Sequence, residues 1–401
     1  MDTFLPVNRR DMEEWGWTEL DFLLVTGDAY VDHPSFGHAI VSRVLVDEGY
    51  RVGIVAQPDW QGTGDLTVMG EPKYAVLVTA GNMDSMVNHY TAARKIRSAD
   101  AYSPGGAIHR RPDRASIVYA NRIREAFSGI PVILGGLEAS LRRFAHYDYW
   151  SDKVRRSILL DSKADLLVYG MGERAVLEIA SRLSRDEDIK DITDVRGSMY
   201  PASDIEKEEG DLWLPAYEAV VSDPKAHAVS VRDAWREQDA VGGRRLIQPH
   251  GGRLVVQNPP AAPLDTAELD RVYELPYART WHPMYGEAGG VPAIQEVRFS
   301  IVSSRGCFGA CSFCALAYHQ GRCVVGRSQE SVLREAAMLT RFPDFKGYIH
   351  DVGGPTANFY GPACEQQQDK GVCKHKNCLY PSPCANLKAD HGEYLDLLRK
   401  V

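Results

Sequence analysis

Apolar runs alternate with amphipathic stretches along the first half of the chain. Runs rich in Val, Leu and Ile occur at residues 21–26, 51–56, 74–79, 131–134 and 165–169. Unbroken runs of this kind are typical of strands that are buried on both faces of a sheet. Apolar side chains recur at helical spacing between them, at residues 36–48, 114–127 and 173–183. Strands that alternate with helices predict an α/β fold with a doubly wound, mostly parallel sheet.

The pattern changes twice in the rest of the chain. Charged residues become frequent from about residue 187, and a proline-rich stretch follows at Pro259–Pro263. Prolines keep the chain extended and end helices, so we place a domain boundary there. We therefore predict a Rossmann-like N-terminal domain over residues 1–186, a connecting subdomain with its linker over 187–263, and a C-terminal part over 264–401.

Composition and charge narrow the function classes. The chain has 401 residues, 44% of them hydrophobic, and a net charge of −8, which weighs against a general nucleic-acid coat. A local basic groove stays open, so nucleic-acid binding is uncertain. No apolar run is long enough to span a bilayer, and we predict a cytoplasmic protein without membrane contact. All eight cysteines lie between Cys307 and Cys384, which in a reducing compartment favours metal ligands over disulfides.

Three of these cysteines form one compact motif. Cys307, Cys311 and Cys314 are spaced C-x3-C-x2-C, with Phe313 directly before the third. A strand-like run at 296–303 precedes them and a helix-like run follows, so we expect the thiols on a strand-to-helix loop. Thiolates are the usual ligands of iron–sulfur clusters, and three of them can leave one iron of a [4Fe–4S] cluster open. Close cysteines can also belong to a zinc site, and that alternative stays open here.

A second motif follows another strand-like run at 346–352. It reads Gly353-Gly354-Pro355-Thr356. Together with the cysteine motif, it resembles the radical S-adenosylmethionine (radical SAM) enzymes, and the order of pieces along the chain resembles the YgiQ-type radical SAM proteins. This resemblance implies a [4Fe–4S] cluster on the three thiols, Phe313 beside the adenine, and backbone groups of Gly353 and Gly354 at the methionine end. Pro355 stands where the superfamily often has an acidic residue.

The resemblance also implies a reaction class. S-adenosylmethionine would be cleaved by one electron to methionine and a 5′-deoxyadenosyl radical, with a donor such as flavodoxin or ferredoxin. The C-terminal part would be the start of a partial (β/α) barrel, and the chain an N-terminal fragment of a longer protein. Arg327 is a candidate contact to the cosubstrate, and Ser328 a candidate N-cap of the next helix. Substrate and catalytic residues are not implied.

Glycine-containing loops suggest a second ligand. The loops at 134–140 and 169–173 resemble those of cobalamin-binding domains, where glycines let the backbone approach a large ligand. The alternative is that these glycines only form tight turns. His33 does not fit the D-x-H-x-x-G motif of cobalt-ligating histidines, so we do not expect it to bind cobalt. One alternative is therefore a cobalamin-assisted radical methyltransferase or methylthiotransferase that acts on RNA or a metabolite. Another is an iron–sulfur or zinc protein that senses redox state or binds nucleic acid without catalysis.

Four further cysteines lie in a stretch rich in glycine, proline and lysine: Cys364, Cys373, Cys378 and Cys384. Such a stretch buries little apolar surface by itself, and metal ligation would supply the missing cross-link. The candidates are an auxiliary iron–sulfur cluster or one zinc ion, with His375 as a substitute ligand. The alternative is a loop with free thiols over the site. Cys323 belongs to neither group and is predicted to be a buried thiol.

Overall fold

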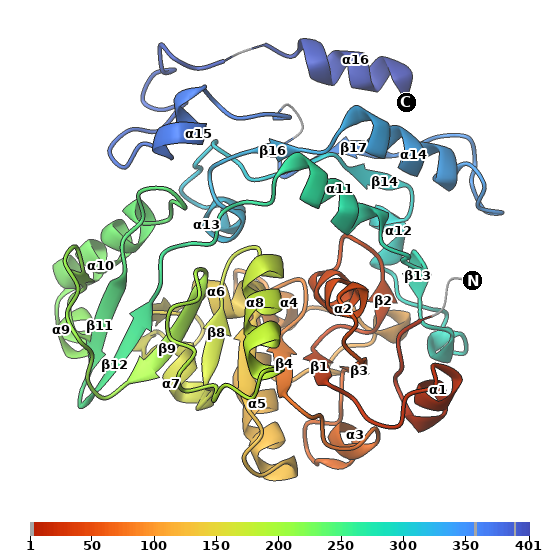
Figure 1. Ribbon diagram of the computed structural model, residues 1–401, viewed down its shortest axis with the longest axis horizontal. Coiled ribbons are helices and arrows are strands. Elements are labelled where there is room, and N and C mark those ends of the chain that lie inside the picture. Colours follow the sequence, from red (N-terminus) through yellow and green to blue (C-terminus); the bar gives the residue numbers. More distant parts are fainter. Residues whose placement is uncertain (1–3, 357–358, 389) are drawn as a thin grey trace.

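Nine strands form one mixed sheet among the residues that the structure describes, which are 4–356, 359–388 and 390–401 (Figure 1). The structure is a computed structural model. One half of the sheet is parallel and contains, in spatial order, β3 (Val52–Ala56), β1 (Phe22–Thr26), β4 (Ala75–Thr79), β5 (Val132–Gly135) and β8 (Leu166–Val168). These five strands coincide with the five apolar runs, so the expectation of an α/β fold with a large parallel sheet is confirmed.

Helices cover both faces of this parallel half. Leu24 of β1 packs in one apolar cluster with Leu45 of α2 (Gly37–Asp47) and Ile179 of α8 (Glu173–Leu183). Val25 of the same strand points the other way, into a cluster with Ile123 of α5 (Ala115–Ala126). Successive side chains of a strand face opposite sides, so a run that is apolar throughout requires such a layer on each face.

The segment 187–263 extends the sheet instead of forming the connecting subdomain that we expected. It supplies β9 (Ser198–Ala202), β12 (Arg253–Gln257), β11 (Leu246–His250) and β10 (Leu212–Trp213). β9 pairs antiparallel with β8, and β12 and β11 continue antiparallel from it. Met199 joins the apolar cluster on one face and Tyr200 the cluster on the other, so the two layers continue without a break.

The remaining elements of the N-terminal half connect these strands. They are α1 (Arg9–Glu14), β2 (Val31–Asp32), α3 (Gly64–Thr67), α4 (Ser85–His89), a 3-10 turn (Pro104–Gly106), α6 (Gly136–Leu141), β6 (His146–Asp148), β7 (Lys153–Arg155), α7 (Ile158–Ser162), α9 (Tyr217–Ser222) and α10 (Pro224–Arg236). No helix in the described ranges is both long and apolar enough for a membrane span.

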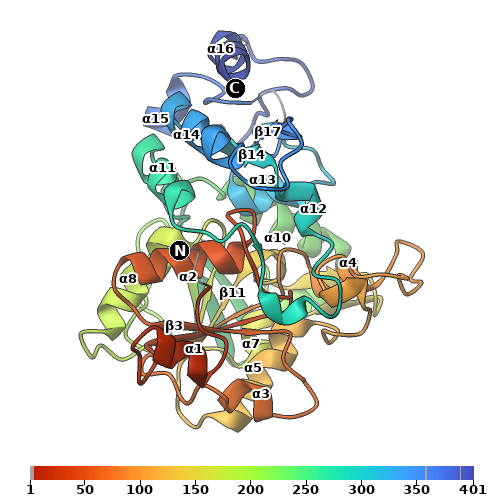
Figure 2. The same ribbon diagram turned by 90° about the vertical axis from the view of Figure 1, so that its right-hand side faces the viewer.

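The C-terminal part lies against the N-terminal half, on the side shown at the top of Figure 2. It contains α11 (Thr266–Glu274), β13 (Thr280–Trp281), a 3-10 turn (Pro283–Tyr285), α12 (Ile294–Val297), β14 (Ser300–Val302), β15 (Ser304–Arg305), α13 (Ala315–Gln320), β16 (Val325–Gly326), α14 (Gln329–Leu339), β17 (Asp351–Gly353), α15 (Gln366–Lys370) and α16 (Gly392–Lys400). β14 and β17 form a parallel pair. The strand expected over 296–303 is shorter than predicted, because Ile294 packs as part of a helix against Val291 and Ala293.

Candidate active site around the Cys307 loop

The Cys307 loop, residues 306–314, joins β15 to α13 as predicted. Gly306 has φ +85°, and a Cβ there would lie 1.9 Å from the carbonyl oxygen of Cys323, so only glycine fits this turn. The amide of Gly306 donates to Gln320 Oε1 (3.1 Å), and that of Cys307 donates to the carbonyl of Gly321 (3.0 Å). The start of the loop is therefore held by the C-terminal end of the helix that follows it.

The thiols of this loop differ in exposure. Cys307 is buried, Cys314 is partly buried and Cys311 is exposed. A Cβ built on Gly309 would lie 3.3 Å from Cys307 Sγ and 3.9 Å from Cys311 Sγ, so the missing side chain leaves a hollow between two thiols. Cys307 Sγ also lies 3.0 Å from Thr356 Oγ1.

The donor set suits an iron–sulfur cluster, because three thiols share one short loop. In the parts of the chain that the structure describes, no three His, Cys, Asp or Glu side chains are already arranged around one metal position. The thiols would therefore have to close on a cluster as it binds.

The two motif glycines lie beside this loop, at the end of β17. Ser303 donates its amide to the Gly353 carbonyl (2.8 Å), which continues the pairing of β14 with β17. A Cβ on Gly354 would lie 2.3 Å from Ser304 Oγ and 2.7 Å from the Ser304 carbonyl oxygen. Glycine at position 354 thus lets the second strand approach the entrance of the Cys307 loop.

Phe313 and Arg327 stand in contrasting environments. The Phe313 ring is 90% exposed, so its predicted contact with an adenine is neither made nor blocked by the protein. Arg327 is buried; it pairs with Glu335 and donates from Nη2 to Ser331 Oγ (2.8 Å). These contacts fix α14 near β14, and Ser328 caps that helix as expected by accepting from the Ser331 amide. A cosubstrate contact by Arg327 stays a prediction, and it would require Arg327 to leave these partners.

A cavity of about 780 Å³ opens between the glycine strand and the N-terminal sheet. Gly353 and Gly354 line it from one side, together with Arg305. Glycines that follow β5 and β8 line it from the other side, at Gly135, Gly136, Gly170 and Gly172. Ligands of open α/β sheets bind beyond the carboxyl ends of the strands, and the cavity occupies that position. Its volume is in the range of small-molecule sites.

Arg305 connects the Cys307 loop to the N-terminal sheet, a role that the sequence analysis missed. Its buried guanidinium pairs with Glu173, the first residue of α8, and donates to the Tyr273 hydroxyl from Nε (3.1 Å). Burial alone would lower the pKa of Arg305, but the Glu173 carboxylate and Tyr273 raise it above its usual value. The sequence contained one signal for this contact: a basic residue stands just before the cysteine motif, and an acidic residue ends a glycine loop.

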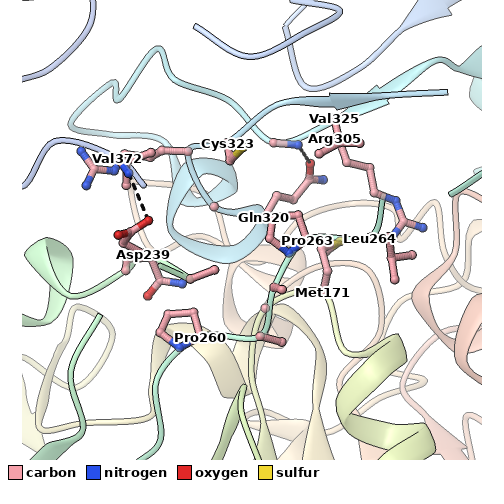
Figure 3. Close-up of a pocket in the computed structure, with 18 of the residues that line it drawn as sticks. Met171, Asp239, Pro260, Pro263, Leu264, Arg305, Gln320, Cys323, Val325 and Val372 are labelled. Atoms are coloured by element: carbon pink, nitrogen blue, oxygen red, sulfur yellow. Dashed lines mark hydrogen bonds between the residues drawn. The ribbon is translucent and has the colours of Figure 1, made fainter. Parts of the chain in front are cut away.

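A second cavity of about 520 Å³ adjoins the first across Arg305, Met171 and His319 (Figure 3). Asp239 stands at its far end and accepts from the Val372 amide through Oδ1 (3.1 Å). His319 Nδ1 lies 2.9 Å from Ser140 Oγ. Burial lowers the pKa of His319 to about 4, with help from a nearby arginine, so the ring at the junction of the cavities is neutral at pH 7.

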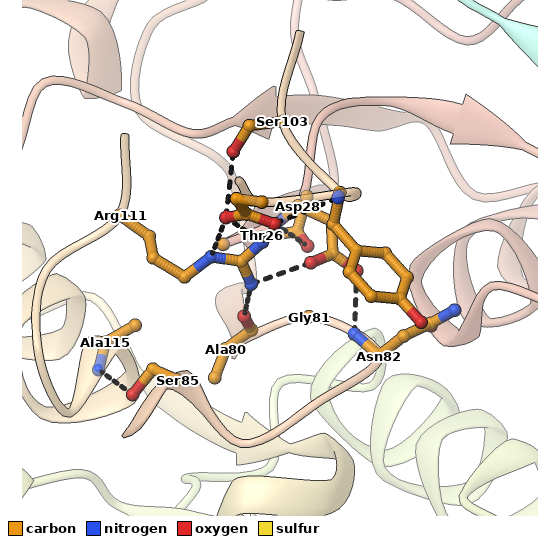
Figure 4. A network of polar contacts seen from close by, with 12 residues as sticks. Thr26, Asp28, Ala80, Gly81, Asn82, Ser85, Ser103, Arg111 and Ala115 are labelled. Carbon is orange, nitrogen blue, oxygen red and sulfur yellow. Dashed lines mark hydrogen bonds and ion pairs between the residues drawn. The ribbon is translucent and has the colours of Figure 1, made fainter. Parts of the chain in front are cut away.

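Charged residues beyond β1 and β4 are paired with one another (Figure 4). Arg111, fully buried, donates from Nη1 to Asp28 Oδ1 (2.8 Å) and from Nε to Asp100 Oδ2 (3.1 Å). Asp28 Oδ2 accepts from the Asn82 amide (2.7 Å). Burial raises the pKa of Asp28 despite the guanidinium beside it. Arg111, from the basic loop at 109–114, is thus used in internal ion pairs that tie sheet loops together.

His33 holds a local turn. It is buried, and its Nδ1 accepts from the Ser35 amide (3.1 Å). Burial lowers the pKa of His33 well below its usual value. The cavity is lined by Pro34, Ser35 and His38 of this segment rather than by the His33 ring.

The four cysteines of the later group lie in a loop region around α15. Cys364, Cys378 and Cys384 are partly buried and Cys373 is exposed. The amide of Cys384 donates to the carbonyl of Cys378 (2.9 Å). Cys323, predicted to be buried, is only partly buried, and burial raises the pKa of its thiol.

Known proteins match this chain over most of its length. A family model described as "Radical SAM N-terminal" matches residues 4–300. A UPF0313 protein of Clostridium botulinum is 56% identical over 398 residues, and a UPF0313 protein of Clostridium perfringens is 54% identical over 399 residues. Both alignments cover 99% of this chain, but 62% and 60% of the relatives. The chain thus spans less than two thirds of their length.

Solved structures offer a more distant likeness. The radical S-adenosylmethionine methyltransferase TsrM from Kitasatospora setae, with tryptophan substrate and a SAM analog bound, aligns with a TM-score of 0.45 at 18% identity. The alignment covers 83% of this chain and 47% of TsrM. We base no argument on a likeness of this size.

Proposed function

The chain belongs to the radical SAM N-terminal family, and from this premise we propose that it is part of a radical SAM enzyme. Cys307, Cys311 and Cys314 would hold a [4Fe–4S] cluster, with S-adenosylmethionine bound beside it. One observation carries the proposal: the three thiols share a strand-to-helix loop whose entrance is packed against a glycine strand that lines a large cavity. The narrower YgiQ-type assignment stays a prediction.

The bound cluster would supply one electron that cleaves S-adenosylmethionine to methionine and a 5′-deoxyadenosyl radical, chemistry that belongs to the cofactor. The protein would provide binding and orientation. Gly353 and Gly354 present backbone without side chains toward the cavity, which suits a polar methionine end. Thr356 lies against the Cys307 thiol and orients it. Phe313 offers a free ring face for the adenine.

The substrate would occupy the 780 Å³ cavity. A carbon radical must be kept from water, and this cavity is closed on one side by the carboxyl ends of β4, β5 and β8. His319, neutral at pH 7, and the Arg305–Glu173 pair are the polar groups where the two cavities meet.

The size of this cavity, with glycines along one wall, also favours a second candidate function. A cobalamin bound there would make the protein a radical methyltransferase of the kind that we considered from the sequence. His33 would still not ligate cobalt there, because its ring does not line this cavity. Cobalamin added to the reconstituted protein distinguishes the two functions, since only the second predicts stoichiometric binding.

The test is anaerobic reconstitution of the chain with iron and sulfide, followed by reduction in the presence of S-adenosylmethionine. We expect an iron–sulfur EPR signal that changes when S-adenosylmethionine is added, and 5′-deoxyadenosine detectable by mass in the full-length relative from Clostridium botulinum. Cys307→Ala should abolish the change that S-adenosylmethionine causes in the EPR signal and the formation of 5′-deoxyadenosine, whereas Cys323→Ala, a matched change outside the motif, should leave both. A cluster that ignores S-adenosylmethionine in both proteins would refute the proposal and favour a non-catalytic metal protein.

A further inference from the structure

The segment that carries the four later cysteines packs against the Cys307 loop. Cys378 packs against an apolar cluster that contains Phe308, the residue after Cys307, together with Val324 and Ala363. Phe308 and Ala310 of the Cys307 loop also line a small cavity that Cys373 and Cys378 line from the other side. The segment from 364 to 384, here called the Cys-rich insert, therefore faces the first thiol motif across this cavity.

The thiols of the Cys-rich insert are near one another. Cys373 and Cys378 line one small cavity together with Gln367, whose Nε2 donates to Cys378 Sγ (4.0 Å). A backbone hydrogen bond brings the two ends of the insert together, because Lys388 donates its amide to the Ala363 carbonyl (2.8 Å). Within the insert, Gln367 donates its amide to the Cys364 carbonyl (3.2 Å), and Cys384 donates to the Cys378 carbonyl (2.9 Å). Four thiols that were spread over the sequence are thus collected in one region.

A buried arginine in the same cavity lacks an anionic partner. Arg322 is only 5% exposed, and its Nη1 donates to the Cys373 carbonyl (3.2 Å). Its Nε and Nη2 are buried and have no hydrogen-bond partner among the described residues. Unsatisfied buried donors are costly, so their presence points to an acceptor that metal-bound thiolates would provide.

Local charge supports the same conclusion. Residues 364–388 contain four lysines and two acidic residues, although the whole chain has a net charge of −8. Lys376 lines the small cavity together with Cys373 and Cys378. Positive neighbours stabilise thiolates, which are the form that binds metal.

We propose that the Cys-rich insert holds a second metal centre with four thiolate ligands, Cys364, Cys373, Cys378 and Cys384. Arg322 is its positioning residue, since its free N–H groups would donate to the thiolate sulfurs. The thiols do not surround a common point in the structure, so the metal would draw them together as it binds. The metal is either one zinc ion or a [4Fe–4S] cluster, and in both cases four thiolates would bind it.

The test separates this centre from the cluster of the proposed function. The triple variant Cys307→Ala, Cys311→Ala, Cys314→Ala removes the first thiol motif and leaves the insert intact. We expect it to retain, after reconstitution and gel filtration, either about one zinc or about four irons with sulfide per chain. Adding Cys373→Ser and Cys378→Ser should remove this metal, whereas adding Cys323→Ser should not.

Arg322→Met keeps the length of the side chain and removes its donors. We expect metal loss to a chelator to become roughly 10- to 100-fold faster, as is typical when hydrogen bonds to metal ligands are removed. If the triple variant does not fold, the metal content of the wild-type protein tests the proposal instead. The wild-type protein should hold either about eight irons or about four irons plus one zinc. No metal in the folded triple variant, or about four irons and no zinc in the wild type, would overturn the proposal.

Discussion

The glycine pair at the end of β17 offers a matched test of the site geometry. A Cβ on Gly354 would lie 2.3 Å from Ser304 Oγ and 2.7 Å from the Ser304 carbonyl oxygen, and the carbonyl cannot rotate away. A Cβ on Gly353 would meet nothing nearer than Asp351 Oδ1 at 3.4 Å, which is ordinary contact. Overpacking of this kind costs about 1–3 kcal/mol, so Gly354→Ala should destabilise the β14–β17 pair by about 2 kcal/mol. Gly353→Ala should change its stability little.

Amide hydrogen exchange of peptides that span β14 and β17 measures this difference directly. About 2 kcal/mol corresponds to roughly 30-fold faster exchange in Gly354→Ala, with Gly353→Ala close to wild type. Binding of S-adenosylmethionine to the reconstituted variants supplies a second readout, since a backbone contact at both glycines predicts weaker binding in both. Equal exchange rates in the two variants would refute the packing argument, because it rests on the approach of Gly354 to Ser304 alone.

Further predictions concern the link to the N-terminal sheet, the histidines and the exposed aromatic ring. Glu173→Gln removes the charge that compensates buried Arg305 and should lower the free energy of unfolding in denaturant by about 3 kcal/mol. An unchanged free energy of unfolding would contradict a compensating role of this ion pair. Burial lowers the pKa of His146 and His250 to about 4, so between pH 6.5 and pH 4 the unfolded chain binds more protons than the folded protein. The free energy of unfolding should therefore fall as the pH is lowered over this range, by up to about 1.4 kcal/mol per pH unit for each ring. His146→Gln should make this dependence of stability on pH less steep. Phe313→Ala should leave stability within about 0.5 kcal/mol, since the ring is 90% exposed, while weakening S-adenosylmethionine binding in calorimetry.

Local pattern was enough to predict the parallel strands of the large sheet but not the antiparallel strands β9 and β11. β1, β3, β4, β5 and β8 are buried on both faces, and that environment leaves an unbroken apolar run in the sequence. β11 contains Pro249 and His250, and β9 ends in Pro201 and Ala202, so neither has such a run. Their place in the sheet depends on pairing with distant strands, which single-sequence periodicity does not record.

The candidate site shows the same limit. Spacing alone identified the thiol motif and the glycine pair, because chemistry restricts which residues can stand there. Arg327 looked like a ligand contact, yet the structure buries it against Glu335, a partner eight positions along the chain. Arg305 and Glu173 form a pair across 132 positions, which no local pattern could indicate. Motifs were visible in the sequence, whereas the contacts that hold them against the sheet were not.

Two different parts of the chain form the two sides of the 780 Å³ cavity. The residues beside the proposed cluster site come from the C-terminal part, whereas the opposite wall of the 780 Å³ cavity comes from the loops after β4, β5 and β8. A radical that removes hydrogen from an unactivated carbon has little selectivity of its own, so selectivity must come from how the substrate is held. Under the proposed function, changes at Gly136 or Gly172 should therefore alter which substrate is processed while S-adenosylmethionine is still cleaved, and changes at Cys307 should stop cleavage for every substrate.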